Sequence, residues 1–149
     1  MATGLVATAA APADAATLVG GPGPNHIVGT PRADHIFGNA GDDRLDGRGA
    51  DDLIAGGAGE DSVLGRSGDD RLRDGPDDDL VGGGGGADHV YVGFGSDVVR
   101  AGSGNDIVSV AADRARDVVW CGPGRDWVLV GADDTSVVMH DCEKVFLIH

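Results

Sequence analysis

Aspartate recurs at every ninth residue along most of this chain, together with glycine and one aliphatic residue. Residues 56–73 contain two successive copies, GGAGEDSVL and GRSGDDRLR, with Asp at position 6 and an aliphatic residue at position 8. Both copies have glycine at positions 1 and 4. The short Asp side chain suits a turn, where it reaches nearby backbone or a cation held there. The first chemistry that this spacing indicates is therefore repeated cation binding.

The aspartate column continues over many copies. Its members are Asp34, Asp43, Asp52, Asp61, Asp70, Asp79, Asp88, Asp97 and Asp106. Asn25 stands in register one repeat earlier, and the aliphatic column runs through ten copies, from Ile27 to Val108. A two-residue slip follows in VAADRARD, and the pattern resumes at Asp117 and Asp126. Tandem repeats of a short fixed period indicate a solenoid, in which each unit stacks on its neighbours.

The composition points to the same conclusion. The 149 residues, one domain's worth of chain, include 27 glycines, and aromatic residues make up only 4%. Asp accounts for 23 of the 25 acidic residues, and the net charge is −14. Such a charge weighs against nucleic acid and anionic membranes as partners and favours cations. No stretch reaches the roughly 18 apolar residues of a membrane-spanning helix, so membrane insertion is not expected.

The nonapeptide resembles the calcium-binding repeat GGxGxDxUx of RTX (hemolysin-type) proteins over about residues 20–130. The resemblance implies an all-β fold, a right-handed parallel β-roll in which each coil uses two nonapeptides. The first six residues of each repeat would form a turn and the last three a short strand. Calcium ions would lie between turns stacked on the same side of the roll.

The resemblance also implies which residues contribute to the calcium sites. They are the nine aspartates of the column and glycines of the best-preserved turns, namely Gly38, Gly41, Gly56, Gly59, Gly65 and Gly68. With eighteen residues per coil, alternate aspartates form one ladder on each side. We expect a weak or distorted site at the turn 74–79, where Pro76 and Asp77 break the pattern, and imperfect turns at Arg32 and Ala50. Acidic residues at position 5, such as Glu60, should face solvent.

Energetic considerations predict that the repeats need calcium to fold. Burying one aliphatic side chain stabilises by about 1.5–3 kcal/mol, while ordering each backbone costs about 1–2 kcal/mol. Aspartates stacked at the strand spacing of about 4.8 Å also repel one another. The metal-free repeats should therefore be largely disordered. Sites of this kind in extracellular modules bind calcium at about 10⁻⁴–10⁻³ M, so extracellular calcium would fold the chain.

The two ends of the chain differ from the repeats. Residues 1–16 are predicted to be a secretory signal peptide, because a small apolar stretch precedes the cleavage pattern Ala13-Asp14-Ala15. No Lys or Arg precedes Arg32, so a disordered Ala-rich tail is the alternative. Residues 131–149 should cap the open end of the roll, since position 7 turns apolar from Val98 onward and Trp120, Val130 and Phe146 add bulk.

Cys121 and Cys142 are the only cysteines. In a chain with a signal-like N-terminus an even cysteine count indicates a disulfide, here one that would pin the cap to the last repeat. The alternatives are a catalytic thiol with His140, or a metal site. The sequence has no zinc spacing and no recognisable signature of a cysteine enzyme.

No catalytic motif is present, so we expect no enzymatic activity. The favoured function is a secreted, stand-alone calcium-binding β-roll with a structural or cell-surface role. One alternative is a repeat-bearing fragment of a larger secreted enzyme or toxin, although the chain has no room for the catalytic domain. Another is a calcium-dependent adhesin with a cell-surface or polysaccharide partner. Positions 3 and 5 show no regular Thr or Asn array, which argues against ice binding. The oligomeric state stays open.

Overall fold

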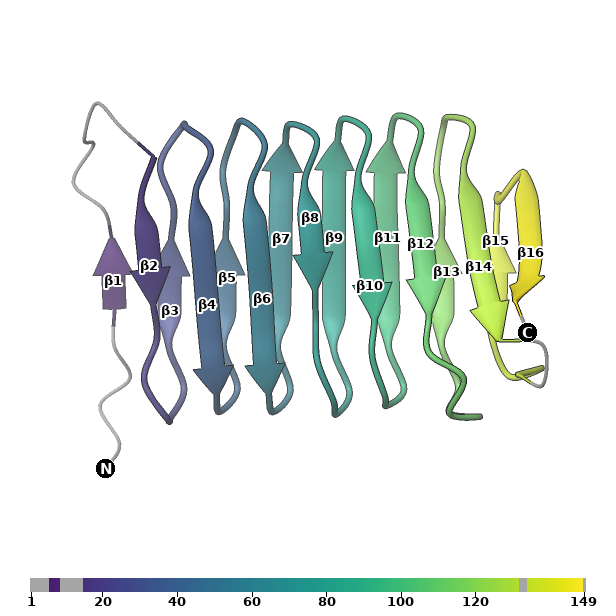
Figure 1. Cartoon of the computed structure of the whole chain (residues 1–149), viewed down its shortest axis with the longest axis horizontal. Coiled ribbons are helices and arrows are strands. Elements are labelled where there is room, and N and C mark those ends of the chain that lie inside the picture. Colours follow the sequence, from purple (N-terminus) through teal and green to yellow (C-terminus); the bar gives the residue numbers. More distant parts are fainter. Residues whose placement is uncertain (1–5, 9–14, 132–133, 149) are drawn as a thin grey trace.

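The computed structural model describes residues 6–8, 15–131 and 134–148. Every regular element within these ranges is a β-strand. The described residues therefore contain no helix long and apolar enough to cross a membrane. The strands form two parallel sheets of eight strands each, and the chain passes from one sheet to the other after every strand. Figure 1 shows the two sheets one behind the other along the length of the molecule. The predicted all-β parallel roll is confirmed.

The strands are mostly three to six residues long. One sheet contains β1 (Val6–Thr8), β3 (His26–Val28), β5 (Arg44–Asp46), β7 (Ser62–Ser67), β9 (Leu80–Gly85), β11 (Val98–Ser103), β13 (Val118–Trp120) and β15 (Val138–His140). The other contains β2 (Thr17–Val19), β4 (His35–Ala40), β6 (Leu53–Ala58), β8 (Arg71–Arg73), β10 (His89–Val92), β12 (Ile107–Val110), β14 (Trp127–Gly131) and β16 (Lys144–Ile148).

The register of the sheets reproduces the sequence repeat. In the regular part of the roll, position 8 of one strand pairs with position 8 two repeats later, as Ile36 does with Ile54. After β11 and β12 the offset grows by two residues, so that Val108 pairs with Val128. The two-residue slip of the sequence is therefore absorbed by the connection between β12 and β13, and the aliphatic column stays continuous across it.

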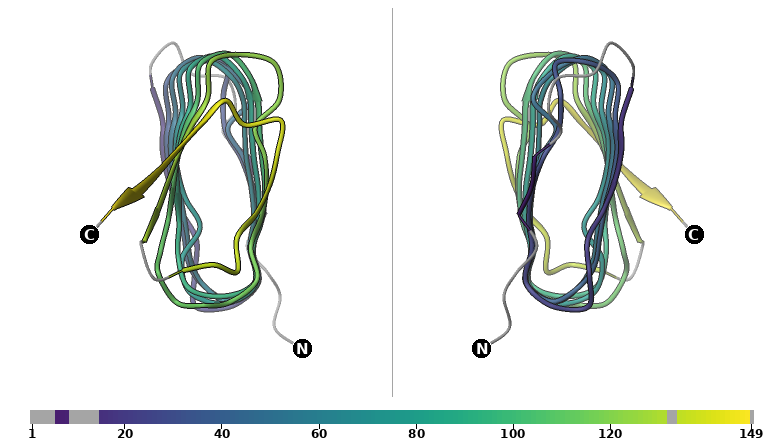
Figure 2. Two further views of the ribbon diagram at one scale, coloured as in Figure 1. Left: turned by 90° about the vertical axis from the view of Figure 1, so that its right-hand side faces the viewer. Right: turned by 90° about the vertical axis from the view of Figure 1, so that its left-hand side faces the viewer.

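The core is a column of aliphatic side chains between the two sheets. Position 8 points inward in every coil and is at most 1% exposed. Its members are Ile27, Ile36, Leu45, Ile54, Val63, Leu72, Val81, Val90, Val99, Val108, Val119 and Val128. Positions 7 and 9 point outward, because successive side chains of a strand face opposite sides of the sheet. The core is consequently only two side chains thick, one from each of the two sheets that Figure 2 shows facing each other along the axis.

Two turn positions adopt the left-handed backbone conformation. Position 4 does so at Gly68, with φ of 125°, and a Cβ there would collide with the backbone of Ala50 in the preceding coil. Position 2 does so as well, for example at Gly57 with φ of 123°. The repeat pattern has its glycine columns at positions 1 and 4, so the positive φ at position 2 is an additional feature. Its signal was the glycine at this position in Gly75 and Gly102, whose φ angles are 141° and 119°.

The core widens toward the C-terminus. Position 1, glycine in most of the earlier turns, becomes a buried apolar residue in the later coils. These residues are Val92, Ala101, Val110, Cys121 and Val130. The predicted disulfide between Cys121 and Cys142 is present, which confirms it. Val137, Met139 and Cys142 pack against the end of the core.

Part of the predicted cap lies elsewhere than expected. The apolar position-7 side chains are on the outer faces of the sheets, where Trp127 is 44% exposed. Trp120 stacks on His140 with ring centroids 5.2 Å apart. β16 pairs with β14 but leaves Phe146 43% exposed, and Figure 2 shows the strand leaving the outline of the coils. At the other end, the predicted signal peptide lies largely outside the described residues.

Candidate metal centre

The position-6 aspartates form two buried ladders, one on each side of the roll. Each is at most 3% exposed. From Asp34 to Asp106, the backbone N–H of each aspartate donates to Oδ1 of the aspartate one coil further on, as from Asp52 to Asp70 at 2.8 Å and from Asp70 to Asp88 at 2.9 Å. Asp43 donates to Asp61 in the same way on the opposite side, at 2.8 Å. These bonds produce the two same-side ladders that the eighteen-residue coil predicts.

In the aspartates of these ladders other than Asp34, and in Asp74, the second carboxylate oxygen is buried without a hydrogen-bond partner. The oxygens concerned are Oδ2 of Asp43, Asp52, Asp61, Asp70, Asp74, Asp79, Asp88, Asp97, Asp106, Asp117 and Asp126. Burying a carboxylate oxygen without a donor is costly, and buried charges in proteins are ordinarily paired or coordinate metals. Ten of these eleven atoms belong to position-6 aspartates and lie in register, which points to a common ligand of positive charge.

Backbone oxygens gather at the same places. At position 1 the Cα of Gly38 lies against both Oδ2 of Asp43 and the carbonyl oxygen of Gly56 in the next coil, so a Cβ there would clash with both. The equivalent contacts recur at Gly47, with Asp52 and the carbonyl of Gly65. A donor set of carboxylate and carbonyl oxygens is what hard cations such as calcium bind. The residues present therefore fit a divalent cation between stacked turns.

The electrostatics of the ladders agree with this fit. Burial raises the pKa of Asp52, Asp61 and Asp70 to about 6, and neighbouring carboxylates add to the effect. Burial raises the pKa of Asp88 and Asp97 to about 7. A cation close to these groups would favour their charged form, because an opposite charge lowers the pKa of a carboxyl. Without a cation, ionising the buried carboxylates is therefore unfavourable, and a bound cation would remove this penalty.

Carboxylates at position 5 behave differently. Asp51, Glu60 and Asp69 are exposed, as the sequence predicts. Asp51 Oδ1 accepts the N–H of Asp69 at 2.9 Å, and Asp69 Oδ1 accepts that of Ala87 at 2.7 Å. These residues therefore link successive turns on the outside of the roll, a contact that the sequence analysis did not foresee.

Two turns with imperfect sequences differ in their geometry. In the turn 29–34, Thr30 donates its backbone N–H to Asp34 Oδ2 at 2.5 Å and its hydroxyl to Oδ1 at 3.0 Å. Asp34, a predicted ligand, is thus satisfied within the protein. Ala50, by contrast, still adopts φ of 67°, and Asp52 keeps its unpartnered Oδ2. The doubt about the Arg32 turn is supported, while the turn containing Ala50 keeps the common geometry.

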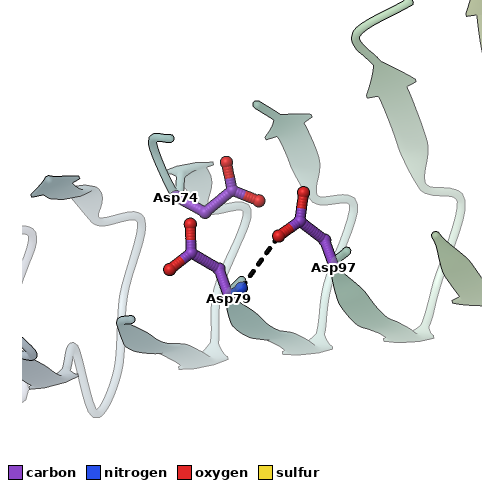
Figure 3. Close-up of side chains that lie close together, drawn as sticks. All are labelled: Asp74, Asp79 and Asp97. Atoms are coloured by element: carbon purple, nitrogen blue, oxygen red, sulfur yellow. Dashed lines mark hydrogen bonds between the residues drawn. The ribbon is translucent and has the colours of Figure 1, made fainter. Parts of the chain in front are cut away.

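The turn 74–79 contains a buried carboxylate that the sequence analysis did not single out. Asp74 occupies position 1 in place of glycine and is fully buried. One oxygen from each of Asp74, Asp79 and Asp97 lies within 4.8 Å of the other two. Figure 3 shows the carboxylate of Asp74 directed toward Asp97, and the dashed line marks the 2.8 Å bond from the Asp79 N–H to Asp97 Oδ1.

A second group of carboxylates lies near the C-terminal end of the roll. Asp113, Asp117 and Asp134 also bring oxygens within 4.8 Å of one another. Asp113 accepts the N–H groups of Gly95 and Ala115, both at 2.8 Å. Asp134 accepts backbone N–H groups as well, so only Asp117 retains an unpartnered oxygen. Hydrogen bonds account for most of this group.

Three residues with the same buried environment were absent from the predicted ligand set. Asp117 and Asp126 continue the two ladders after the slip and keep unpartnered Oδ2 atoms. Their place two residues before Val119 and Val128 could have identified them. Asp74 had no such signal, because it stands outside the aspartate column.

The roll is thus a parallel β-solenoid of acidic, glycine-rich nonapeptides with oxygen-lined turns. The sequence matches the RTX calcium-binding nonapeptide repeat in four copies, at residues 19–54, 46–81, 55–90 and 82–114. Together these copies span residues 19–114, more than half of the chain, and the protein belongs to this family. A comparison with curated proteins finds no match. The RTX repeat is a structural calcium-binding repeat and is not itself catalytic, and RTX proteins are typically secreted.

Proposed function

We propose that this chain is a secreted calcium-binding β-roll that folds on binding several calcium ions and has a structural or cell-surface role. The observation that carries the proposal is the row of buried, unpartnered Asp Oδ2 atoms along both sides of the roll. Residues 20–130 would form the calcium-binding repeats and residues 131–149 the cap. Residues 1–16 would direct export.

The proposed ligands are the position-6 carboxylates and carbonyl oxygens of the glycine-rich turns. Of the predicted aspartates, Asp43 through Asp106 fit this role best, while Asp34 is occupied by Thr30. Bound calcium would neutralise the stacked carboxylates and link successive turns. Because the ligands converge only in the folded chain, the binding free energy would contribute to folding.

Metal counting tests the proposal. The purified chain would be dialysed against calcium at concentrations up to several millimolar, and bound calcium per chain would be measured by atomic emission. We expect several ions per chain, cooperative binding, and much weaker binding of magnesium, which requires a smaller octahedral site. A chain that binds fewer than two calcium ions at these concentrations would contradict the proposal.

A calcium-dependent adhesin is the second candidate function, and the outer face of the β2–β16 sheet favours it. In a chain of net charge −14, the outward residues of these strands include no Asp or Glu. Arg73 and Tyr91 border a groove of about 590 Å³, together with Phe94, which is 61% exposed. Cationic and aromatic side chains on one flat face suit an acidic polysaccharide, through ion pairing and ring stacking.

Affinity electrophoresis in gels containing polygalacturonate tests this second function. The calcium-loaded chain should be retarded, and Arg73→Ser should reduce the retardation. Arg32→Ser, which removes an equal charge from an exposed turn, should leave it unchanged. Equal mobility in polygalacturonate and in neutral dextran would exclude an acidic glycan as the partner.

The remaining alternative is that the repeats belong to a larger secreted enzyme or toxin. Reading the coding sequence in frame on both sides of this chain distinguishes it from a stand-alone protein.

A further inference from the structure

The turn 74–79 has a side chain at position 1, where each of the preceding turns has a glycine hydrogen. Asp74 is fully buried, and its Oδ1 accepts the N–H groups of Gly75 at 2.7 Å and of Gly93, in the next coil, at 2.8 Å. Its Oδ2 is buried without any hydrogen-bond partner. Two amide donors thus fix the carboxylate in place, and Figure 3 shows it directed toward Asp97.

One carboxylate oxygen from each of Asp74, Asp79 and Asp97 lies within 4.8 Å of the other two. Asp79 and Asp97 are 3% and 0% exposed, and each has a buried Oδ2 without a partner. Figure 3 shows Asp74 beside the two ladder aspartates, from which it is separated along the chain by a proline-containing turn. Among the described residues the one salt bridge joins Arg66 to Asp46, so no protein cation offsets the three carboxylates.

We infer that Asp74, Asp79 and Asp97 form the tightest cation site of the roll. The inference rests on the proposed function, and it reverses the expectation that this turn holds a weak site. That expectation considered only Pro76 and Asp77, which break the repeat pattern. Calcium affinity rises with the number of charged ligands and with the rigidity of the site, and this turn has one carboxylate more than its neighbours, already held in place by amide groups.

Two substitutions of Asp74 test whether its carboxylate binds the cation or only accepts hydrogen bonds from backbone amides. Asp74→Asn keeps a side-chain oxygen for the N–H groups of Gly75 and Gly93 but removes the charge. Asp74→Gly restores the residue that the repeat pattern has at position 1. If Asp74 merely disturbs a standard site, the glycine variant should bind calcium more tightly; if it is a ligand, both variants should bind more weakly.

The matched control is Asp78→Asn. Asp78 lies in the same turn and loses the same charge, but its side chain is exposed. Its Oδ1 accepts the N–H of Ser96 at 2.8 Å, on the outside of the roll. A comparison between the variants of Asp74 and Asp78 therefore isolates the effect of position within the turn.

The measurement is the dissociation constant of the tightest calcium ion, obtained by competition with a chelator of known affinity on the full chain. We expect Asp74→Asn and Asp74→Gly each to raise this constant by at least about tenfold, and Asp78→Asn to change it by less than about twofold. Circular dichroism at saturating calcium shows whether each variant folds.

Three outcomes would overturn the inference. They are an unchanged constant in Asp74→Asn, tighter binding in Asp74→Gly, and an equal loss in Asp78→Asn. In each of these outcomes the wild-type chain still binds calcium and the proposed function stands. A wild-type chain that binds no calcium would instead remove the proposed function together with the inference.

Discussion

At the scale of the residue, position 6 differs from position 5 in where its carboxylate points. Asp61 is 3% exposed, its Oδ1 accepts the N–H of Asp43, and its Oδ2 is unpartnered. Glu60, its neighbour in the chain, is exposed. Adjacent acidic residues of similar chemistry therefore differ in burial, as the spacing of the repeat predicts.

We predict that Asp61→Ala weakens calcium-induced folding far more than Glu60→Ala. The first change removes a proposed ligand and leaves the buried Asp43 N–H without its acceptor, whereas the second removes one exposed charge. Titration with calcium, followed by circular dichroism, should show a midpoint several-fold higher for Asp61→Ala only. Equal midpoints for the two variants would contradict the register.

Other features of individual residues could not be predicted from the repeat. The occupation of Asp34 by Thr30 depends on a local turn that the column of aspartates does not encode. The burial of Asp74 depends on a side chain turning inward where glycine is expected. Both are departures from the pattern, and a periodic sequence predicts only what the copies share.

At the scale of the element, the unit of construction is a turn stacked on the equivalent turn of the next coil. The aliphatic column followed from the nine-residue period, and the strand positions and the eighteen-residue coil followed from the resemblance to RTX repeats. Alternation within a three-residue strand then leaves one inward side chain. The disulfide was also predictable, since only two cysteines are present. The outward position of Trp127 was not, because apolar character alone does not say which face of a strand is covered.

Because the turns are stacked in close contact, adding one methyl group at a turn glycine should lower the stability of the fold. In Gly68→Ala the new Cβ would meet the carbonyl group of Ala50, and Gly68 has φ of 125°, which a non-glycine residue adopts at a cost. Gly49, one coil earlier on the same side of the roll, has an ordinary φ. In Gly49→Ala the nearest atom to the new Cβ would be the Ser67 hydroxyl oxygen, at 3.2 Å.

Thermal unfolding at saturating calcium measures the difference. Gly68→Ala should lower the free energy of unfolding by roughly 1–3 kcal/mol, while Gly49→Ala should change it by less than about 1 kcal/mol. Similar losses in both variants would indicate that the turns are not in close contact in solution.

At the scale of the whole molecule, many buried carboxylates make stability depend on pH. Burial raises the pKa of Asp79 to about 8, with contributions from Asp74, Asp61 and Asp97, and burial raises the pKa of Asp117 to about 7. The ordinary pKa of an aspartate side chain is 3.8. At pH values between 3.8 and about 8, the folded chain without metal therefore binds more protons than the unfolded chain. Its stability consequently falls as the pH rises through this range.

We accordingly predict that the EDTA-treated chain gains β-structure when the pH is lowered from 8 to 5. With calcium the dependence should reverse: more calcium should be needed for folding at pH 5 than at pH 8, because protons compete for the carboxylates. Circular dichroism measures both, with sedimentation to detect aggregation near the sequence pI of 4.3. Metal-free β-structure that increases with pH would contradict the electrostatic account.

The central claim is that calcium binding supplies much of the free energy that orders this thin-cored solenoid. Small-angle X-ray scattering of the same sample, before and after exhaustive chelation, tests it most directly. We predict a radius of gyration of roughly 15–20 Å with calcium and an expansion toward about 40 Å, the value for an unfolded chain of this length, after chelation at pH 8. An unchanged, fully ordered particle after verified removal of all metal would contradict the claim.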